Sequence, residues 1–100
     1  QAEESATFMK IVWTEQAIAD LEEIEHYIAQ ERPSAARRVA AHLVTSVEHL
    51  AEFPQLGRPG PRPGMRSLVT PPYVISYRVR SGSLQVLTIW HGRRQRREIS

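Results

Sequence analysis

The segment 73–91, YVISYRVRSGSLQVLTIWH, carries the clearest structural signal in this chain of 100 residues. Its two halves are rich in β-branched and aromatic residues, which is typical of strands. Ser81 and Gly82 lie between the halves and favour a tight two-residue turn, because glycine tolerates a positive φ. We therefore predict a β-hairpin with strands at 73–79 and 84–91, in which Arg80 pairs with Ser83.

This register assigns the side chains of the hairpin to two faces. One face is apolar and is expected to pack against helices; it carries Tyr73, Ile75, Tyr77, Val79, Leu84, Val86, Thr88 and Trp90. The other face is mixed and carries Val74, Ser76, Arg78, Gln85, Leu87, Ile89 and His91. Because arginine and histidine lie on the mixed face, we expect it to be open or covered by a partner.

Two amphipathic helices are predicted upstream of the hairpin. Thr14 is a candidate N-cap for the first, and apolar residues recur at helical spacing as far as Ile28. Pro33 suits the first turn of the second helix, which should end before Pro54, because the residue that precedes a proline disfavours the α conformation. A short link between the two helices predicts that they form an antiparallel helical hairpin.

Two further strands complete the predicted fold. Lys10–Trp13 is short and β-branched, and residues 66–70 precede the hairpin. Residues 54–65, with four prolines and three glycines, are expected to form a connecting loop. The predicted fold class is α+β in two layers: an N-terminal strand, an antiparallel two-helix hairpin and a three-stranded antiparallel meander.

The charge of the chain is divided unequally between its halves. Residues 1–52 carry ten acidic and four basic side chains, a charge of −6, whereas residues 53–100 carry nine basic and one acidic, a charge of +8. Twelve of the thirteen basic residues are arginines. Because the planar guanidinium makes bidentate contacts with phosphate and carboxylate groups, the C-terminal half predicts an anionic partner.

Composition excludes several functional classes. The chain has no cysteine, which excludes a disulfide scaffold, a thiol nucleophile and a thiolate zinc site. The spacing of His26, His42, His49 and His91 does not predict a metal site, so no metal or cofactor is expected. No apolar run approaches the roughly 18 residues of a membrane span, and we expect a cytoplasmic protein without a membrane partner. Residues 1–8 are expected to be a leader or vector remnant outside a single domain at 9–100.

Four stretches carry a family resemblance: WTEQAIADLEEIEHYIAQERPSAA, VEHLAEFPQLGRPG, PGMRSLVTPPYVISYRV and LTIWHGRR. In them the chain resembles the RelE/ParE toxins of bacterial type II toxin–antitoxin modules. The resemblance implies the two-layer fold and a cognate antitoxin whose C-terminal segment wraps over the toxin. RelE-like members cleave mRNA in the ribosomal A site, whereas ParE-like members inhibit DNA gyrase.

Two positions favour the ParE-like branch. RelE-like nucleases carry an arginine directly after the tyrosine that opens the hairpin, and a tyrosine near the C-terminus; here these positions hold Val74 and Ser100. An apolar valine cannot stabilise charge on phosphorus. The resemblance thus favours a non-enzymatic toxin that inhibits DNA gyrase by stoichiometric binding. A ribosome-dependent mRNA endoribonuclease is the alternative, and an antitoxin-binding paralogue without toxicity is a second one.

The basic residues and the mixed face supply the candidate site residues. For target binding we predict Arg58, Arg66, Arg93, Arg94, Arg96 and Arg97. For antitoxin binding we predict Val74, Arg78, Leu87, Ile89 and His91. If the protein is a nuclease, the catalytic set is Arg66, His91 and Arg94, because histidine serves as a general acid or base and arginine stabilises phosphate charge. Alternatively, His91 is not catalytic and forms a structural hydrogen bond at the end of its strand.

Overall fold

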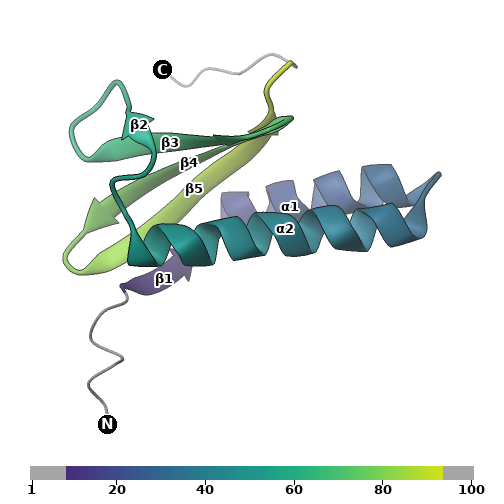
Figure 1. The fold of residues 1–100 in the computed structure, drawn as a ribbon, viewed down its shortest axis with the longest axis horizontal. Coiled ribbons are helices and arrows are strands. Elements are labelled where there is room, and N and C mark those ends of the chain that lie inside the picture. The colour runs from purple at the N-terminus through teal and green to yellow at the C-terminus, as the bar shows by residue number, and fades with distance from the viewer. Residues whose placement is uncertain (1–8, 94–100) are drawn as a thin grey trace, which may run out of the picture.

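The computed structural model describes residues 9–93, and it shows a two-layer α+β fold, which confirms the predicted class (Figure 1). One layer is a helical hairpin formed by α1 (Glu15–Ala29) and α2 (Pro33–Glu52). The other layer is a sheet of five strands: β1 (Lys10–Trp13), β2 (Arg58–Pro59), β3 (Met65–Thr70), β4 (Tyr73–Arg80) and β5 (Ser83–His91). No helix within residues 9–93 combines the length and the apolar character needed to cross a membrane.

The strand order is β1-β5-β4-β3-β2, so the first strand joins the sheet beside the last. β1 runs parallel to β5, and the other neighbours are antiparallel. Arg80 pairs with Ser83, as predicted. Ser81 and Gly82 have φ values of 49° and 77°, the left-handed conformations that a type I′ turn requires.

One strand was not predicted. β2 lies inside the segment that we expected to be a loop, and it pairs Arg58 with Ser67 and Pro59 with Arg66. Two residues cannot be recognised as a strand from periodicity, because alternation needs about four residues to show. The outer edge of β3 is thereby covered over only part of its length.

A β-bulge divides the hairpin. Tyr77 pairs with Val86, but Ser76 pairs with Thr88, so Leu87 is an extra residue in β5. A single inserted residue reverses which face each later side chain of the strand occupies. The predicted faces are therefore correct before the bulge and wrong after it.

Beyond the bulge, four residues change sides relative to the prediction. Ile89 pairs with the core residue Ile75 and is 3% exposed, so it does not lie on the mixed face. His91 pairs with Tyr73 on the same helix-facing side. Trp90, predicted to face the helices, pairs instead with Val74 of the open face. Thr88 pairs with Ser76 of the open face, but it lies at the sheet edge, where its hydroxyl still reaches Asp20 of α1.

Helix α1 begins at the residue that the sequence predicts, and it also supplies hydrogen-bond partners to the edge of β5. The Thr14 hydroxyl accepts a hydrogen bond from the Ala17 N–H at 3.1 Å, as an N-cap does, and donates to the Val86 carbonyl at 2.8 Å. Further along, the Asp20 carboxylate accepts from the Ile89 N–H at 2.9 Å and from the Thr88 hydroxyl at 2.7 Å. The N-cap residue and a side chain of α1 thus provide hydrogen-bond partners for β5 along the edge that β1 no longer covers.

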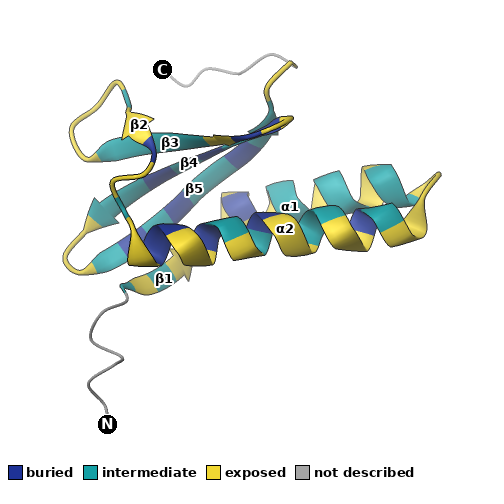
Figure 2. Ribbon diagram, viewed as in Figure 1, coloured by how far each residue is buried: buried dark blue, intermediate teal, exposed yellow. Residues whose placement is uncertain are grey.

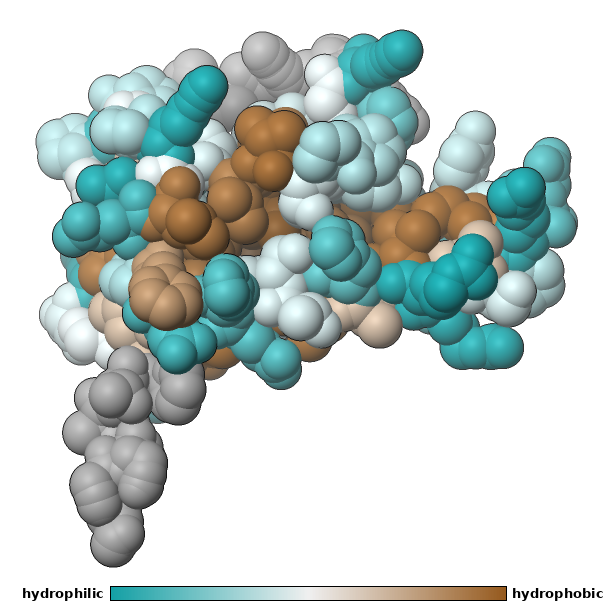
Figure 3. Space-filling view, viewed as in Figure 1, coloured by the Kyte–Doolittle hydropathy of each residue, from teal (hydrophilic) through white to brown (hydrophobic). Residues whose placement is uncertain are grey.

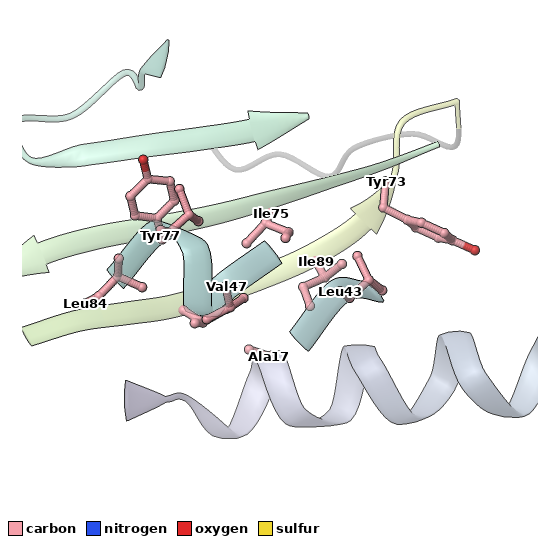
Figure 4. Packing of buried hydrophobic residues seen from close by; sticks show 10 residues of the cluster. Ala17, Leu43, Val47, Tyr73, Ile75, Tyr77, Leu84 and Ile89 are labelled. Atoms are coloured by element: carbon pink, nitrogen blue, oxygen red, sulfur yellow. The ribbon is translucent and has the colours of Figure 1, made fainter. Parts of the chain in front are cut away.

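The core lies between the two layers and is made of apolar side chains from both (Figures 2 and 4). Its buried members are Ala17, Leu43, Val47, Leu50, Tyr73, Ile75, Tyr77, Leu84, Val86 and Ile89. The tip of the helical hairpin projects past the end of the sheet (Figure 1). This packing buries one face of the sheet, and no helix within residues 9–93 covers the opposite face.

Candidate interaction surface

The loop after α2 is held to the sheet by a buried tyrosine. The Gly57 N–H donates to the Tyr77 hydroxyl oxygen at 2.9 Å, and that hydroxyl donates to the Pro54 carbonyl at 2.7 Å. A Cβ atom at position 57 would lie 2.6 Å from the Tyr77 hydroxyl oxygen and 2.7 Å from the Ser67 carbonyl oxygen. Only glycine fits there, which gives the FPQLGR stretch a structural explanation.

Arg66 belongs to the same network. Its guanidinium Nη1 donates to the Gly57 carbonyl oxygen at 2.7 Å, and the side chain is half-buried. Burial raises the pKa of the Tyr77 hydroxyl above its ordinary value of 10.0, while the hydrogen bond from Gly57 and the charge of Arg66 act in the opposite direction. The structure therefore gives this predicted target-binding and catalytic residue an internal contact.

The other arginines carry no such contact among residues 9–93. Arg58 is exposed on β2, Arg78 is half-buried on β4, and Arg93 is exposed just after β5. Within the part of the chain that the structure describes, none of these three side chains forms a hydrogen bond or an ion pair to another residue. Residues 53–93 contain no aspartate or glutamate, so this half of the fold supplies no carboxylate of its own.

The structure does not bring Arg66 and His91 together. Arg66 pairs with Tyr77 and His91 pairs with Tyr73, four residues away along β4, a separation of about 13 Å before the width of two strands is added. The His91 Nδ1 accepts a hydrogen bond from the Arg93 N–H at 3.1 Å, and its ring packs edge-on against Tyr73 at 5.4 Å. This contact agrees with the alternative interpretation of His91, in which the ring forms a structural hydrogen bond.

Three predicted target residues, Arg94, Arg96 and Arg97, lie outside the described residues. Within residues 9–93, no three histidine, aspartate or glutamate side chains gather in a way that could hold a metal ion. His42, one of the four histidines, instead has its Nε2 at 2.9 Å from the Thr70 hydroxyl oxygen, a contact between α2 and the end of β3.

The predicted antitoxin-binding residues are separated by the bulge. Val74 and Arg78 lie on the open face, opposite the helices, and Leu87 is the half-buried bulge residue. Ile89 is a core residue and His91 faces the helix side, so neither belongs to the open face.

Val69 and Trp90 were missed as residues of that face. Val69 pairs with Val74 and is 57% exposed, and Trp90 pairs with Val74 from the other side. The register of β3 would have revealed Val69, but Trp90 is placed on this face only by the bulge.

A second apolar surface follows α2. Phe53 is 50% exposed and Leu56 is 51% exposed in the turn after the helix, and the Phe53 ring packs against His49 at 5.2 Å. Figure 3 shows apolar surface gathered where α2 lies beside the sheet, with hydrophilic residues around it. Leu56 is only two residues from Arg58, so apolar and basic surface adjoin here.

Comparisons with known proteins agree with this fold. The family model described as ParE toxin of type II toxin-antitoxin system, parDE, matches residues 11–96. Toxin RelE2 of Caulobacter vibrioides is 42% identical over 85 residues, which cover 85% of this chain and 97% of that protein.

Two solved structures are similar as well. A chain of the chromosomal ParDE TA system from P. aeruginosa has a TM-score of 0.74 and 31% identity, covering 85% of this chain and 97% of that one. A chain of the toxin-antitoxin complex RelBE2 from Mycobacterium tuberculosis has a TM-score of 0.66 and 21% identity, covering 85% and 92%, and is similar in fold. With a family model that spans nearly all of the described residues and a toxin relative at 42% identity, this chain belongs to the ParE toxin family of type II toxin–antitoxin systems.

Proposed function

We propose that this ParE-family toxin inhibits DNA gyrase by stoichiometric binding, without an enzymatic step of its own, and that a cognate antitoxin neutralises it in the cytoplasm. The observation that carries the target proposal is the separation of Arg66 from His91. The similar solved structures come from a ParDE system and from a RelBE2 toxin–antitoxin complex, which supports an antitoxin as partner.

Cleavage of a phosphodiester needs a base, an acid and charge stabilisation within reach of one phosphate. Arg66 and His91 lie about 13 Å apart along the strands, and Arg66 is bonded to Gly57. Val74 supplies no charge where a RelE-like nuclease has arginine. Loss of one electrostatic donor alone lowers a rate by roughly 10²–10³. These features disfavour a nuclease and favour a toxin that acts by occupancy.

Target binding is attributed to arginines that the fold leaves without partners. The side chains of Arg58 and Arg93 are exposed and form no hydrogen bond or ion pair among the described residues. The sequence adds Arg94, Arg96 and Arg97 directly after Arg93. Because no carboxylate lies between residues 53 and 93, the field of these groups attracts an anionic surface of the gyrase–DNA complex.

The test compares two assays on the same purified toxin. Supercoiling by gyrase should be inhibited, and inhibition should weaken at least tenfold in the Arg58→Ala, Arg93→Ala double variant. Arg37→Ala removes an exposed arginine of α2 and serves as the matched control, with inhibition unchanged. Supercoiling that is unaffected by saturating toxin would overturn the proposal.

The alternative function, a RelE-like mRNA endoribonuclease, is tested directly because one similar protein is named Toxin RelE2. Ribosomes translating a defined mRNA are incubated with the toxin, and the mRNA is mapped for cuts. We expect intact mRNA. Cleavage that disappears in His91→Ala would establish the RelE-like endoribonuclease instead. Absence of growth arrest when the toxin alone is induced in bacteria would identify an antitoxin-binding paralogue without toxicity.

A further inference from the structure

The open face of the sheet changes character along its length. At one end Val69, Val74 and Trp90 lie side by side on β3, β4 and β5. All three are partly or well exposed, and Val69 is 57% exposed. A contiguous row of apolar side chains on a solvent-facing sheet is typical of a surface that a partner covers.

At the other end of the same face lies a row with one basic side chain, Arg78. Arg78 is flanked by Met65 on β3 and Gln85 on β5, and Ser67 and Ser76 lie between this row and the apolar one. Arg78 is four residues from Val74 along β4, so the two rows are about 13 Å apart. The face therefore has an apolar end, a polar middle and a basic end.

Arg78 carries an unsatisfied group. Its Nε is buried and has no hydrogen-bond partner among residues 9–93. A buried donor without an acceptor is unfavourable, and one carboxylate can accept from Nε and a terminal nitrogen together. Because residues 53–93 contain no aspartate or glutamate, this half of the fold does not supply that carboxylate.

We infer that the open face binds one peptide segment of the antitoxin, with a carboxylate on Arg78 and an apolar side chain on the Val69–Val74–Trp90 row. This inference rests on the proposed function, which makes an antitoxin the partner. The two anchors must be about 13 Å apart, which corresponds to about four residues of an extended segment or about nine residues of a helix. The segment is therefore acidic at one end and apolar at the other.

A nucleic acid fits this face less well than a peptide. Its phosphates would satisfy Arg78, but a phosphodiester backbone offers no apolar group to cover Val69 and Val74. A peptide with both kinds of side chain covers both rows, and removal of the apolar row from water contributes to affinity.

The experiment measures binding between the full-length toxin and the antitoxin encoded beside its gene, by calorimetry at two salt concentrations. Arg78→Gln should raise Kd at least tenfold and reduce its salt dependence, because a charged contact is lost. Val69→Asp should also raise Kd at least tenfold, whereas Val69→Thr, which keeps the β-branched shape, should raise it less. The controls Arg37→Gln and Tyr27→Asp, both at exposed helix positions, should leave Kd within about twofold.

Thermal unfolding of each variant separates docking from folding. Positions 27, 37 and 69 are exposed, and the half-buried Arg78 side chain has no internal hydrogen bond to lose among residues 9–93, so each variant should keep the wild-type midpoint within a few degrees. A tight complex that is unaffected by Arg78→Gln and Val69→Asp would overturn the inference while leaving the antitoxin partner in place. Binding of a short RNA that is lost in Arg78→Gln but kept in Val69→Asp, with antitoxin affinity unchanged, would assign the face to nucleic acid and also overturn it. Absence of any complex with wild-type toxin would overturn the antitoxin partner itself.

Discussion

The guanidinium Nη1 of Arg66 donates a hydrogen bond to the carbonyl oxygen of Gly57 at 2.7 Å. This contact joins β3 to the turn that leads from α2 into β2, and the Tyr77 hydroxyl binds the other side of the same glycine. Arg58, the exposed arginine that we assign to target binding, is the next residue in the chain. Arg66 thus helps to fix the backbone from which Arg58 projects.

Replacement of Arg66 should therefore reduce stability. Arg66→Ala removes a charged donor from the Gly57 carbonyl and should lower the free energy of unfolding by about 2 kcal/mol, the range for hydrogen bonds to charged groups. Arg58→Ala, at an exposed position without internal contacts, should change it by less than about 0.5 kcal/mol. Urea denaturation of the two variants measures the difference; equal stabilities would show that the Arg66 contact contributes nothing.

Gly57 should not tolerate a side chain. Gly57→Ala places a methyl group 2.6 Å from the Tyr77 hydroxyl oxygen and 2.7 Å from the Ser67 carbonyl oxygen, so it should destabilise the fold by about 1–3 kcal/mol. Gly60→Ala is the comparison: its Cβ would lie 3.1 Å from the Met65 carbonyl oxygen, a milder contact, so it should destabilise the fold less than Gly57→Ala.

The double variant Gly57→Ala, Tyr77→Phe tests the mechanism. It removes the contact with the hydroxyl oxygen but keeps the contacts with the ring carbon Cε1 at 2.8 Å and with the Ser67 carbonyl oxygen at 2.7 Å. Its loss should therefore fall short of the sum of the two single losses. Strict additivity in thermal unfolding would contradict a steric conflict between positions 57 and 77.

Alkaline pH should destabilise the protein through Tyr77. The pKa of its hydroxyl is raised in the folded state, mainly by burial, so the folded chain holds this proton more tightly than the unfolded chain. The resulting stability is fully present below about pH 10, the unfolded value, and is lost as pH rises through the higher folded pKa.

The measurement is an ultraviolet titration of tyrosine ionisation combined with urea denaturation between pH 8 and pH 11. Tyr77→Phe should remove the late-titrating group, whereas Tyr27→Phe, at a position 70% exposed, should leave that group in place. A late group that survives in Tyr77→Phe would contradict the assignment.

Asp20 should contribute more to the free energy of unfolding than the other acidic residues of α1. Its carboxylate accepts hydrogen bonds from the Ile89 N–H and the Thr88 hydroxyl, so Asp20→Ala leaves both donors unpaired at the sheet edge. We expect a loss of about 2 kcal/mol in the free energy of unfolding. Glu22→Ala, at an exposed position, should change it by less than about 0.5 kcal/mol, and a similar loss in both variants would refute the edge role of Asp20.

Local sequence signals predicted most of the fold. Thr14 marks the start of α1 by capping it, and Pro33 marks the start of α2 as its first residue. Ser81-Gly82 fixes the pairing of Arg80 with Ser83. These features depend on a few neighbouring residues, so they are visible without tertiary information. The fold class and the inward direction of Tyr77 followed from them.

The site was less predictable because it depends on long-range register. The bulge at Leu87 exchanged Ile89 for Trp90 on the open face, and no local signal marks an inserted residue in an otherwise regular strand. The bond between Arg66 and Gly57 joins residues nine positions apart through the pairing of β2 with β3, which was itself unpredicted. Charge alone could not separate this arginine from those that remain free of internal contacts.

A titration of gyrase with purified toxin distinguishes inhibition by binding from cleavage of mRNA. Supercoiling is followed at a fixed gyrase concentration well above Kd while toxin is added in steps, with a ribosome-bound mRNA analysed in parallel. The proposal predicts inhibition that grows in proportion to added toxin and levels off when gyrase is saturated, with the mRNA intact. Cleavage of many mRNA molecules per toxin molecule, with supercoiling unaffected, would contradict it.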